Sequence, residues 1–352
     1  MPRGQELVSP RVRAMHGYTP GEQPKPGSLV KLNTNENPYP CSPLVAEAIA
    51  AEAAGLHLYP SPMADALREA AARTYGVKAA QVMAGNGSDE LLAIVLRSCV
   101  EPGDPVAWPV PTYSLYATLA EIVGARAVQV DGRQQEDAVL RELAAARAKV
   151  TFLCTPNSPT GRSLELEAIA AFARAATGVV VVDEAYIDFG GPSVLALLAD
   201  HPNMVVSRTF SKSYSLAGLR LGLLFGHEDL LAELAKVKDS YNVSRLAIAA
   251  GVAALEDSAW MENNVARIRA TRVRVTAALR QGGYTVADSA ANFLWVDCSA
   301  RGGGKAVYDK LREGGVLVRF FPGDALAAGM RVSIGTDDEM DRFLAVLGVD
   351  AA

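Results

Sequence analysis

Short apolar runs alternate along most of the chain with longer segments in which apolar residues recur at three- and four-residue spacing. The runs are rich in β-branched residues, as buried strands are, and the longer segments have the periodicity of amphipathic helices. The expected strands are Val106–Trp108, Ala127–Val130, Val150–Cys154, Val179–Val182 and Met204–Ser207. This alternation predicts an α/β fold with a mostly parallel central sheet and helices on both of its faces.

The pattern changes near Glu228, where it becomes long and helical and runs through Val265–Val275. Two further strand-like runs, Phe293–Val296 and Val316–Arg319, then predict a smaller α+β domain. The first thirty residues are rich in Pro and Gly and predict an extended arm. The expected divisions are an arm over 1–30, a large domain over 31–240 and a small domain over 241–352, with helices bridging the last boundary.

Composition narrows the class of protein. The chain has 352 residues, half of them hydrophobic, and a net charge of −5, which is typical of a globular enzyme. The basic residues do not cluster, which argues against nucleic acid as the main partner. The apolar runs are too short to span a membrane. The start of the chain lacks the apolar core of a signal peptide, so we expect a cytoplasmic location. The four cysteines and four histidines are scattered without ligand-like spacing, so no metal site or disulfide framework is expected.

Lys212 is the most informative residue, because small polar residues flank it and Arg220 follows eight positions later. Pyridoxal phosphate, an aldehyde cofactor, needs an amine for a Schiff base, a hydroxyl and a guanidinium for its phosphate, and small neighbours beside its flat ring. Lys212, Ser211 and Arg220 supply these groups. The plainer interpretation, that Lys212 and Arg220 are exposed charges of a loop, would be favoured if the run stood alone.

A second motif lies about thirty residues upstream, where the apolar run Val179–Val182 ends in Asp183 and, shortly after, Tyr186. Open α/β sheets bind ligands at the carboxyl ends of their strands. There Asp183 could pair with the protonated pyridine nitrogen of the cofactor, and Tyr186 could reach its 3-oxygen. The alternative for Asp183 is a helix cap.

Three further motifs have a functional and a structural interpretation each. Ser88 and Asp89 follow glycines and open a helical pattern, so they could bind phosphate, cap the helix, or do both. Tyr113 follows a strand and two prolines, where its ring could stack on a cofactor or pack in the core. Asn157 lies in a Pro- and Gly-containing segment after Val150–Cys154, which is also typical of a turn.

Two arginines near the end of the chain, Arg319 and Arg331, lie in otherwise apolar runs. Burying a charged guanidinium in such a run costs free energy unless an anion or hydrogen-bond acceptor pairs with it. Its partner is either a bound anion, such as a carboxylate or phosphate, or an internal carboxylate in a salt bridge.

Taken in order, these motifs resemble those of the fold-type I aminotransferases, and among them most closely the histidinol-phosphate aminotransferases. The resemblance runs nearly from end to end of the chain. The motifs that carry it are Asn33-Thr-Asn-Glu-Asn-Pro-Tyr-Pro, Tyr59-Pro, Gly87-Ser-Asp-Glu, Pro111-Thr-Tyr, Pro156-Asn-Ser-Pro-Thr-Gly, Asp183-Glu-Ala-Tyr, Ser211-Lys-Ser-Tyr and Met330-Arg-Val-Ser-Ile-Gly-Thr.

The resemblance implies the roles of the cofactor residues. Lys212 would hold pyridoxal phosphate covalently and then act as general base, with Asp183 on the pyridine nitrogen, Tyr186 on the 3-oxygen and Tyr113 stacked on the ring. The phosphate would be held by Ser88, the backbone amide of Asp89, Ser211 and Arg220. Tyr59 would reach the phosphate from a neighbouring subunit, which implies a homodimer with shared active sites.

The resemblance also implies the substrate residues and points to one departure. Arg319 and Arg331, with Tyr18 and Asn37 nearby, would bind the substrate phosphate or, in amino-acid aminotransferases, an α-carboxylate. The family has asparagine directly before Pro-Thr-Gly, where this chain has Ser158. We expect the preceding Asn157 to make the cofactor contact, because its amide reaches further than a serine hydroxyl.

The sequence therefore predicts an aminotransferase that moves an amino group between a small-molecule donor and a 2-oxo acid or phosphorylated ketone, most closely histidinol phosphate and 2-oxoglutarate in histidine biosynthesis. The alternatives are an aminotransferase for aromatic or other amino acids, a threonine-phosphate decarboxylase, and a cofactor-binding regulatory module without catalysis.

Overall fold

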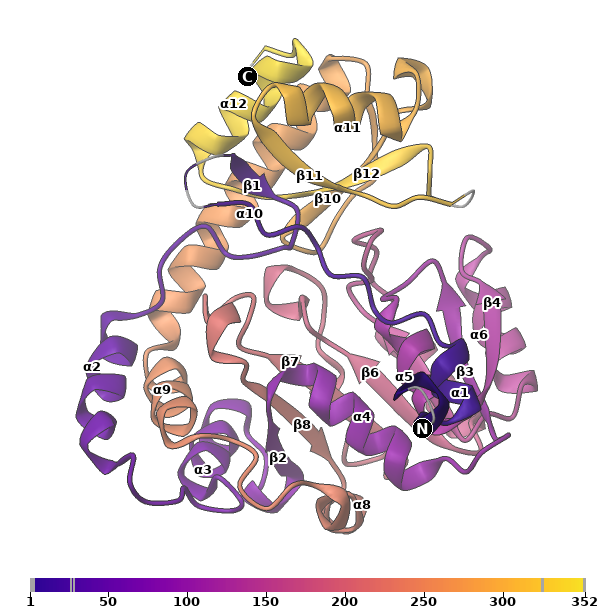
Figure 1. The fold of residues 1–352 in the computed structure, drawn as a ribbon, viewed down its shortest axis with the longest axis vertical. Helices are drawn as coiled ribbons and strands as arrows, with labels where there is room; N and C mark the ends of the chain where they lie inside the picture. Colours follow the sequence, from indigo (N-terminus) through magenta and orange to yellow (C-terminus); the bar gives the residue numbers. More distant parts are fainter. Residues whose placement is uncertain (1–3, 26, 28, 324–325, 351–352) are drawn as a thin grey trace.

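Two β-sheets organise the chain in the computed structural model, which describes residues 4–25, 27, 29–323 and 326–350 (Figure 1). The strands are β1 (Val30–Leu32), β2 (Val82–Gly85), β3 (Pro105–Val110), β4 (Arg126–Asp131), β5 (Val150–Cys154), β6 (Val179–Asp183), β7 (Met204–Thr209), β8 (Gly222–Gly226), β9 (Thr285–Val286), β10 (Phe293–Asp297), β11 (Val316–Phe320) and β12 (Gly329–Ser333). The α-helices are α1 (Pro10–Ala14), α2 (Pro43–Glu52), α3 (Asp65–Tyr75), α4 (Gly87–Cys99), α5 (Leu115–Val123), α6 (Glu136–Ala145), α7 (Leu166–Ala175), α8 (Glu228–Leu234), α9 (Arg245–Glu256), α10 (Ser258–Gln281), α11 (Gly304–Glu313) and α12 (Asp337–Leu347).

The larger sheet has seven strands in the order β2-β8-β7-β6-β5-β3-β4. Its neighbours pair in parallel except at β8, which is antiparallel to both β2 and β7. Successive residues of a strand point to opposite faces, and in β5 Phe152 and Leu153 belong to two different apolar cores. Helices α3, α6, α7 and α9 contribute to one core and α4, α5 and α8 to the other, so the sheet is covered on both faces, as the sequence predicts.

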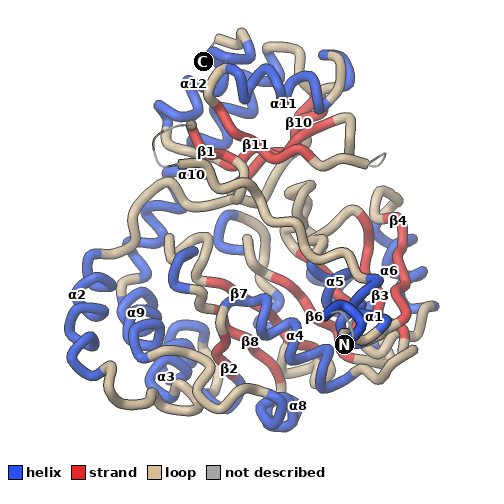
Figure 2. The backbone as a smooth tube through the Cα atoms, viewed as in Figure 1, coloured by secondary structure: helices blue, strands red, loops and turns tan. Residues whose placement is uncertain are grey.

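The smaller sheet has the order β1-β11-β12-β10-β9 and is mostly antiparallel. Helices α10, α11 and α12 supply the apolar residues that pack against it. Helices α11 and α12 lie on the side of this sheet that faces away from the large one (Figure 2). The other side faces the carboxyl ends of the large sheet's parallel strands, and the functional site lies between the two.

The expected domain boundaries at residues 31 and 241 remain predictions. Two elements near them pack with the domain on the other side of the boundary. β1 pairs in parallel with β11, Val30 opposite Val316, so it belongs to the small sheet although the large domain was expected to start there. α9 lies beyond residue 241 but packs against α2 and α3 of the large domain. An apolar pattern indicates that a face is buried but not which layer covers it, so neither placement follows from the local sequence.

The amino-terminal arm contains one short helix, α1, and is irregular from there to β1. Ser9 caps α1 and Pro10 occupies its first turn, a combination that favours helix initiation. Arg11 reaches Gly124 at the end of α5, which places α1 against the large domain. Met1–Arg3, Pro26 and Ser28 of the expected arm, Asp324 and Ala325 between β11 and β12, and Ala351 and Ala352 lie outside the described residues. Within the described ranges, no helix has the length and apolar character needed to cross a membrane.

Candidate active site

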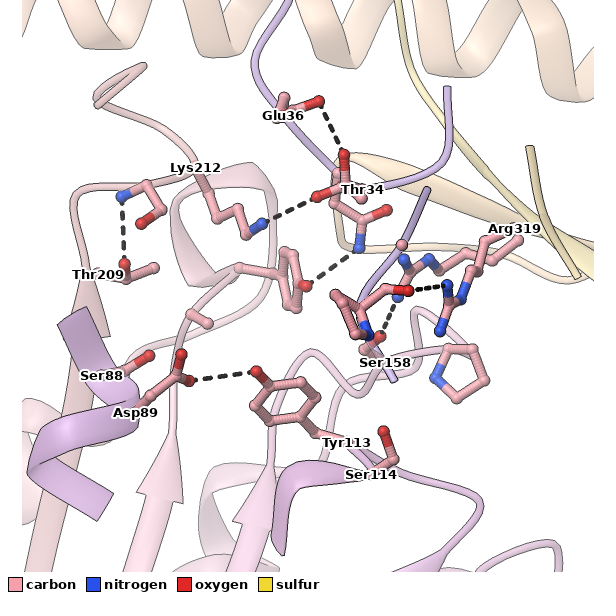
Figure 3. A pocket seen from close by; sticks show the side chains of 18 of the residues that line it. Thr34, Glu36, Ser88, Asp89, Tyr113, Ser114, Ser158, Thr209, Lys212 and Arg319 are labelled. Atoms are coloured by element: carbon pink, nitrogen blue, oxygen red, sulfur yellow. Dashed lines mark hydrogen bonds between the residues drawn. The ribbon is translucent and has the colours of Figure 1, made fainter. Parts of the chain in front are cut away.

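A cavity of about 560 Å³ lies between the two sheets and collects most of the residues that the sequence singles out. Figure 3 shows its side chains converging from the large domain, the segment that follows β1 and the small domain. The predicted site residues that line it are Tyr18, Ser88, Asp89, Tyr113, Asp183, Tyr186, Ser211, Lys212, Arg220, Arg319 and Arg331. Asn37, Tyr59 and Asn157 do not line it.

Lys212 follows β7 and points into the cavity (Figure 3). Its Nζ donates a hydrogen bond to the backbone oxygen of Thr34, at 3.2 Å. Burial, assisted by the positive charge of Arg331, lowers the pKa of Lys212 to about 8. A lysine with such a pKa supplies the neutral, nucleophilic amine near neutral pH.

Asp183 ends β6 and is only 2% exposed. Its carboxylate accepts hydrogen bonds from the Tyr116 hydroxyl at 2.7 Å and the Ala185 backbone N–H at 3.2 Å. Burial raises the pKa of Asp183 to about 6. Among the residues that the structure describes, no cationic side chain pairs with this carboxylate, and a protonated ring nitrogen would provide a cation.

Tyr116 is a member of the site that the sequence reasoning left without a role. It lies three residues after Tyr113 on α5, and its ring stacks on Phe152 with centroids 4.4 Å apart. Burial raises its pKa well above the usual value, so its hydroxyl keeps the proton that it donates to Asp183. Nothing in the local sequence distinguishes this tyrosine from a core residue, because its partner lies 67 positions away.

The amino terminus of α4 forms an anion cradle with Arg220. Ser88 and Asp89 lie in the first turn of the helix, where backbone N–H groups are unpaired and the helix dipole is positive. Arg220 donates to the Ser211 hydroxyl at 3.3 Å and to the Asp89 carboxylate at 3.2 Å. The cradle therefore offers hydroxyls, backbone amides and a guanidinium, which are the groups that a phosphate prefers.

Two glycines keep the cradle open. A Cβ on Gly87 would lie 2.9 Å from Arg220 Nη2, and a Cβ on Gly222 would lie 2.6 Å from the backbone nitrogen of Ser88. The requirement for glycine is steric at Gly222, where the neighbouring atoms belong to the backbone, whereas Gly87 also has a φ of 79°, in the left-handed region that favours glycine. This space, the uncompensated Asp183 and the amine of Lys212 together fit pyridoxal phosphate.

Tyr113 and Tyr186 also line the cavity. Tyr113 donates to Asp89 at 3.1 Å and packs edge-to-face against Tyr116 and Tyr18. Tyr186 accepts a hydrogen bond from Asn35 Nδ2 at 3.0 Å, and burial raises the pKa of its phenol to about 12. Burial also raises the pKa of Tyr113, so both phenols are neutral at physiological pH.

Ser158, rather than Asn157, faces the cavity. The Asn157 side chain turns the other way, accepts from the Thr112 hydroxyl at 2.6 Å and donates to the Pro111 backbone oxygen and the Thr160 hydroxyl. Its amide is engaged in stabilising the turn. Adjacent residues of this turn point in opposite directions, so the longer reach of Asn157 does not help it, and the expectation that it contacts the cofactor does not fit this geometry.

Asn37 also differs from its expected role. Its Nδ2 donates to the backbone oxygens of Lys212 and Ser213, at 3.2 and 3.1 Å. Asn37 therefore supports the loop that carries the lysine instead of lining the substrate cavity. Tyr18, in contrast, does line the cavity.

Arg319 and Arg331 lie opposite each other in the register of β11 and β12. Arg331 donates to the Ser158 hydroxyl at 2.9 Å and to the Asn33 backbone oxygen at 3.0 Å, while its buried Nε has no partner among the described residues. Arg319 donates to the backbone oxygens of Thr19 and Pro20. Across the ranges that the structure covers, neither guanidinium has a carboxylate within salt-bridge distance, so the pair does not form the internal salt bridge considered above.

Tyr59 lies away from the cavity on the protein surface, where it is 78% exposed and stacks on Tyr241 with centroids 4.5 Å apart. Leu56 and Leu58 beside it are more than half exposed. A tyrosine in this position cannot contact the cavity of its own chain.

The part of the chain that the structure describes contains no cluster of three or more histidine, cysteine, aspartate or glutamate side chains suited to a metal ion.

The cavity also includes Thr34, Asn35 and Glu36. They belong to the motif Asn33-Thr-Asn-Glu-Asn-Pro-Tyr-Pro, but the sequence assigned no roles to them. The Thr34 backbone oxygen and the Asn35 side chain contact Lys212 and Tyr186, which lie more than 150 positions away in the chain. Glu36 instead pairs with Lys31 and accepts a hydrogen bond from Thr34.

Comparison with known proteins agrees with the site. Residues 28–347 match the family model "Aminotransferase class I and II". The chain is 43% identical to histidinol-phosphate aminotransferase 1 of Nostoc sp. over 341 residues, covering 96% of both chains, and 45% identical to histidinol-phosphate aminotransferase of Geobacter sulfurreducens, covering 96% of this chain and 97% of the relative.

Among solved structures, histidinol-phosphate aminotransferase from Sinorhizobium meliloti, determined in complex with pyridoxal 5′-phosphate, superposes with a TM-score of 0.87 at 28% identity and covers 97% of this chain and 96% of its own. The match confirms the type I fold that the motifs predict. The chain is a transaminase and belongs to the class I and II aminotransferase family, whose members depend on pyridoxal phosphate.

Proposed function

We propose that this protein is a pyridoxal-phosphate-dependent histidinol-phosphate aminotransferase that exchanges an amino group between histidinol phosphate and 2-oxoglutarate. The observation that carries the proposal is the Arg319–Arg331 pair, two guanidiniums that share the cavity with Lys212 and have no carboxylate partner in the described chain. A phosphate dianion on the substrate would balance both charges. The names of the relatives support the same substrate.

The residues present define how the cofactor would be held. Pyridoxal phosphate, when bound, supplies an aldehyde for amines and an electron-withdrawing ring. Ser88, Ser211, Arg220 and the first turn of α4 would hold its phosphate, and Asp183 would keep a proton on its ring nitrogen. Tyr113 would cover the ring, and Tyr186 would donate to the 3-oxygen. Ser158, and not Asn157, would lie beside the 3-oxygen, and its hydroxyl accepts a hydrogen bond from Arg331.

Lys212 has the two properties that proton transfer in this reaction requires. Its pKa of about 8 lets it give and take a proton near neutral pH, and Thr34 holds its Nζ at one position in the cavity. Lys212 Nζ would take the proton from the substrate carbon and hold it for its return. Arg319 and Arg331 would hold the far end of the substrate so that this carbon stays within reach.

We also propose a homodimer. The exposed apolar residues Leu56, Leu58 and Tyr59 would be covered by a second copy, and Tyr59 would contribute its hydroxyl to the partner's cofactor phosphate. A cytoplasmic location is proposed together with the biosynthetic role.

A single-turnover experiment tests the substrate. Purified protein loaded with pyridoxal phosphate is mixed separately with histidinol phosphate and with phenylalanine, and the loss of visible absorbance is followed. We expect fast conversion with histidinol phosphate and slow conversion with phenylalanine. The reverse order would make the protein an amino-acid aminotransferase in which Arg331 binds a carboxylate.

A further inference from the structure

Asn35 contacts the Tyr186 hydroxyl from the segment that leads from β1 to α2. Asn35 is 1% exposed, and its φ of 54° lies in the left-handed region, which asparagine tolerates better than most residues. Its backbone oxygen accepts a hydrogen bond from Asn292 Nδ2 at 3.0 Å. Asn35 is therefore buried, and hydrogen bonds fix both its backbone and its side-chain amide.

Ser333, the last residue of β12, determines which way the Asn35 amide points. The backbone N–H of Asn35 donates to Ser333 Oγ at 2.8 Å, and Ser333 Oγ lies 3.0 Å from Asn35 Oδ1. Because the backbone N–H can only donate, the single hydroxyl proton of Ser333 is available for Oδ1. With Oδ1 facing the serine, Nδ2 must face Tyr186, and the phenol oxygen accepts.

This orientation leaves the Tyr186 proton directed elsewhere. A phenol donates one hydrogen bond, and Asn35 already occupies an acceptor position of its oxygen. Among the described residues, Asn35 is the hydroxyl's hydrogen-bond partner, and Tyr186 lines the cavity. A ligand oxygen in the cavity is then the natural acceptor of that proton.

We propose that Asn35 is a positioning residue that, oriented by Ser333, makes Tyr186 a hydrogen-bond donor toward the 3-oxygen of pyridoxal phosphate. The inference rests on the proposed cofactor. It extends the site into the small domain, because Ser333 belongs to β12 and Tyr186 follows β6 of the large sheet. Through Asn35, the small domain controls the proton of a phenol in the large domain.

The charged and titratable groups around Tyr186 are Lys212, whose Nζ lies 5.8 Å from the ring centroid, Arg331, Asp183, Cys154 and Tyr113. The test must leave these five groups in place, because each also affects the charge on a bound ring. Asn35 and Ser333 are uncharged and can be changed without removing any of them.

The test is a pH titration of the visible absorbance of the protein loaded with pyridoxal phosphate. A hydrogen bond donated to the ring oxygen favours its negative form and lowers the pH midpoint. Tyr186→Phe should raise the midpoint by about one pH unit. Asn35→Asp should do the same, because its carboxylate accepts the Tyr186 proton in place of the ring oxygen. Ser333→Ala, which adds no charge, should raise it by a smaller amount.

The double variant Asn35→Asp/Tyr186→Phe separates this relay from a direct effect of the new charge. Its midpoint should match that of Tyr186→Phe alone, since Asn35 acts only through the phenol. Asn264→Asp is the matched control, because Asn264 is also a buried asparagine but donates to the Pro40 backbone oxygen, and its midpoint should not move.

Additive shifts in the double variant would overturn the proposal, as would an unchanged midpoint in both Asn35→Asp and Ser333→Ala. If Asn35→Asp does not fold, Ser333→Ala decides the outcome. The titration requires only bound cofactor, so a protein that titrates as expected but does not convert histidinol phosphate would contradict the proposed substrate and leave the relay supported.

Discussion

Burial sets the protonation of Lys212 and Asp183 in opposite ways. It lowers the pKa of the lysine to about 8 and raises that of the aspartate to about 6, because each charged form loses its water. The site therefore contains a lysine with a larger neutral, nucleophilic fraction than an ordinary lysine, and a carboxylate without a cationic partner among the described residues. Both charged forms are less stable here than in water, and the bound cofactor relieves that cost.

Asp183→Asn tests the free-energy cost of burying an ionised carboxylate in the cofactor-free protein. The pKa of Asp183 is higher in the folded chain than in the unfolded one, so its contribution to stability is present below about pH 4 and is lost as the pH rises through about 6. The variant should exceed the wild type in free energy of unfolding at pH 8 by up to about 3 kcal/mol, and the difference should vanish near pH 4.

Urea denaturation at the two pH values measures this difference. The amide introduced by Asp183→Asn can still accept a hydrogen bond from Tyr116, so the two proteins differ in the charge at this position and not in this hydrogen bond. A variant that is equally or less stable than the wild type at pH 8 would contradict the assignment. In the presence of pyridoxal phosphate the order should reverse, because the ring nitrogen loses its carboxylate.

Arg331→Lys tests the substrate end of the site. A lysine keeps the charge but loses the planar fork that can donate to two phosphate oxygens. We expect kcat/KM for histidinol phosphate to fall at least about tenfold, which corresponds to the loss of roughly one charge-assisted hydrogen bond. Arg133→Lys, at an exposed arginine that pairs with Asp131, is the control and should retain wild-type kinetics. Equal kinetics in both variants would place the phosphate elsewhere.

The sequence could identify site residues that carry chemistry but not those that orient them. Lys212, Asp183 and Arg220 have side chains suited to the cofactor and stand next to strands, so their motifs singled them out, and all three line the same cavity. Tyr116 and Asn35 act through partners far away in the chain. The choice between Asn157 and Ser158 depended on the direction of a turn, which reach alone does not determine.

At the scale of elements, the close contact between β8 and α4 builds the phosphate cradle. Gly222 pairs with Gly85 of β2 and lies against the backbone of Gly87 and Ser88. β8 was not among the expected strands, and its antiparallel direction could not be read from the sequence either, because a short apolar run has the same pattern in either direction. The parallel strands were predictable because helical segments separate them.

Gly222→Ala should disturb the cradle from the strand side. The added methyl group would lie 2.6 Å from the backbone of α4, which must shift to accommodate it. We expect the dissociation constant for pyridoxal phosphate to rise at least about tenfold, because helix-terminus contacts depend on distance. Equilibrium dialysis measures the constant.

Gly218→Ala is the matched control. Gly218 lies in the same connection, between β7 and β8, and a Cβ there meets nothing within 4 Å. Its affinity for the cofactor should equal that of the wild type. A loss of the same size in both variants would indicate a general requirement for a flexible loop instead of the proposed steric contact.

At the scale of the whole molecule, the proposed dimer predicts complementation between two defective chains. Lys212→Ala removes the nucleophile, and Tyr59→Ala removes the residue proposed to serve the partner's cofactor. A mixed dimer of the two variants contains one site with both residues intact and one with neither. Mixing and refolding equal amounts should therefore restore up to about a quarter of wild-type activity, since half of random dimers are mixed.

Activity assays of each variant alone and of the mixture measure this effect. No gain on mixing, while sedimentation shows that mixed dimers form, would contradict shared sites. A sedimentation coefficient of a monomer would contradict the dimer itself.

The pairing of β1 with β11 has a consequence for the order in which the protein is made. Val30 leaves the ribosome long before Val316, its partner in the sheet, so β1 must wait unpaired while the large domain folds. The segment just after β1 holds Thr34, Asn35 and Asn37 against the lysine and the phenol. A nascent chain can thus fold its large sheet early, yet it becomes competent for catalysis only when nearly the last strand has been synthesised.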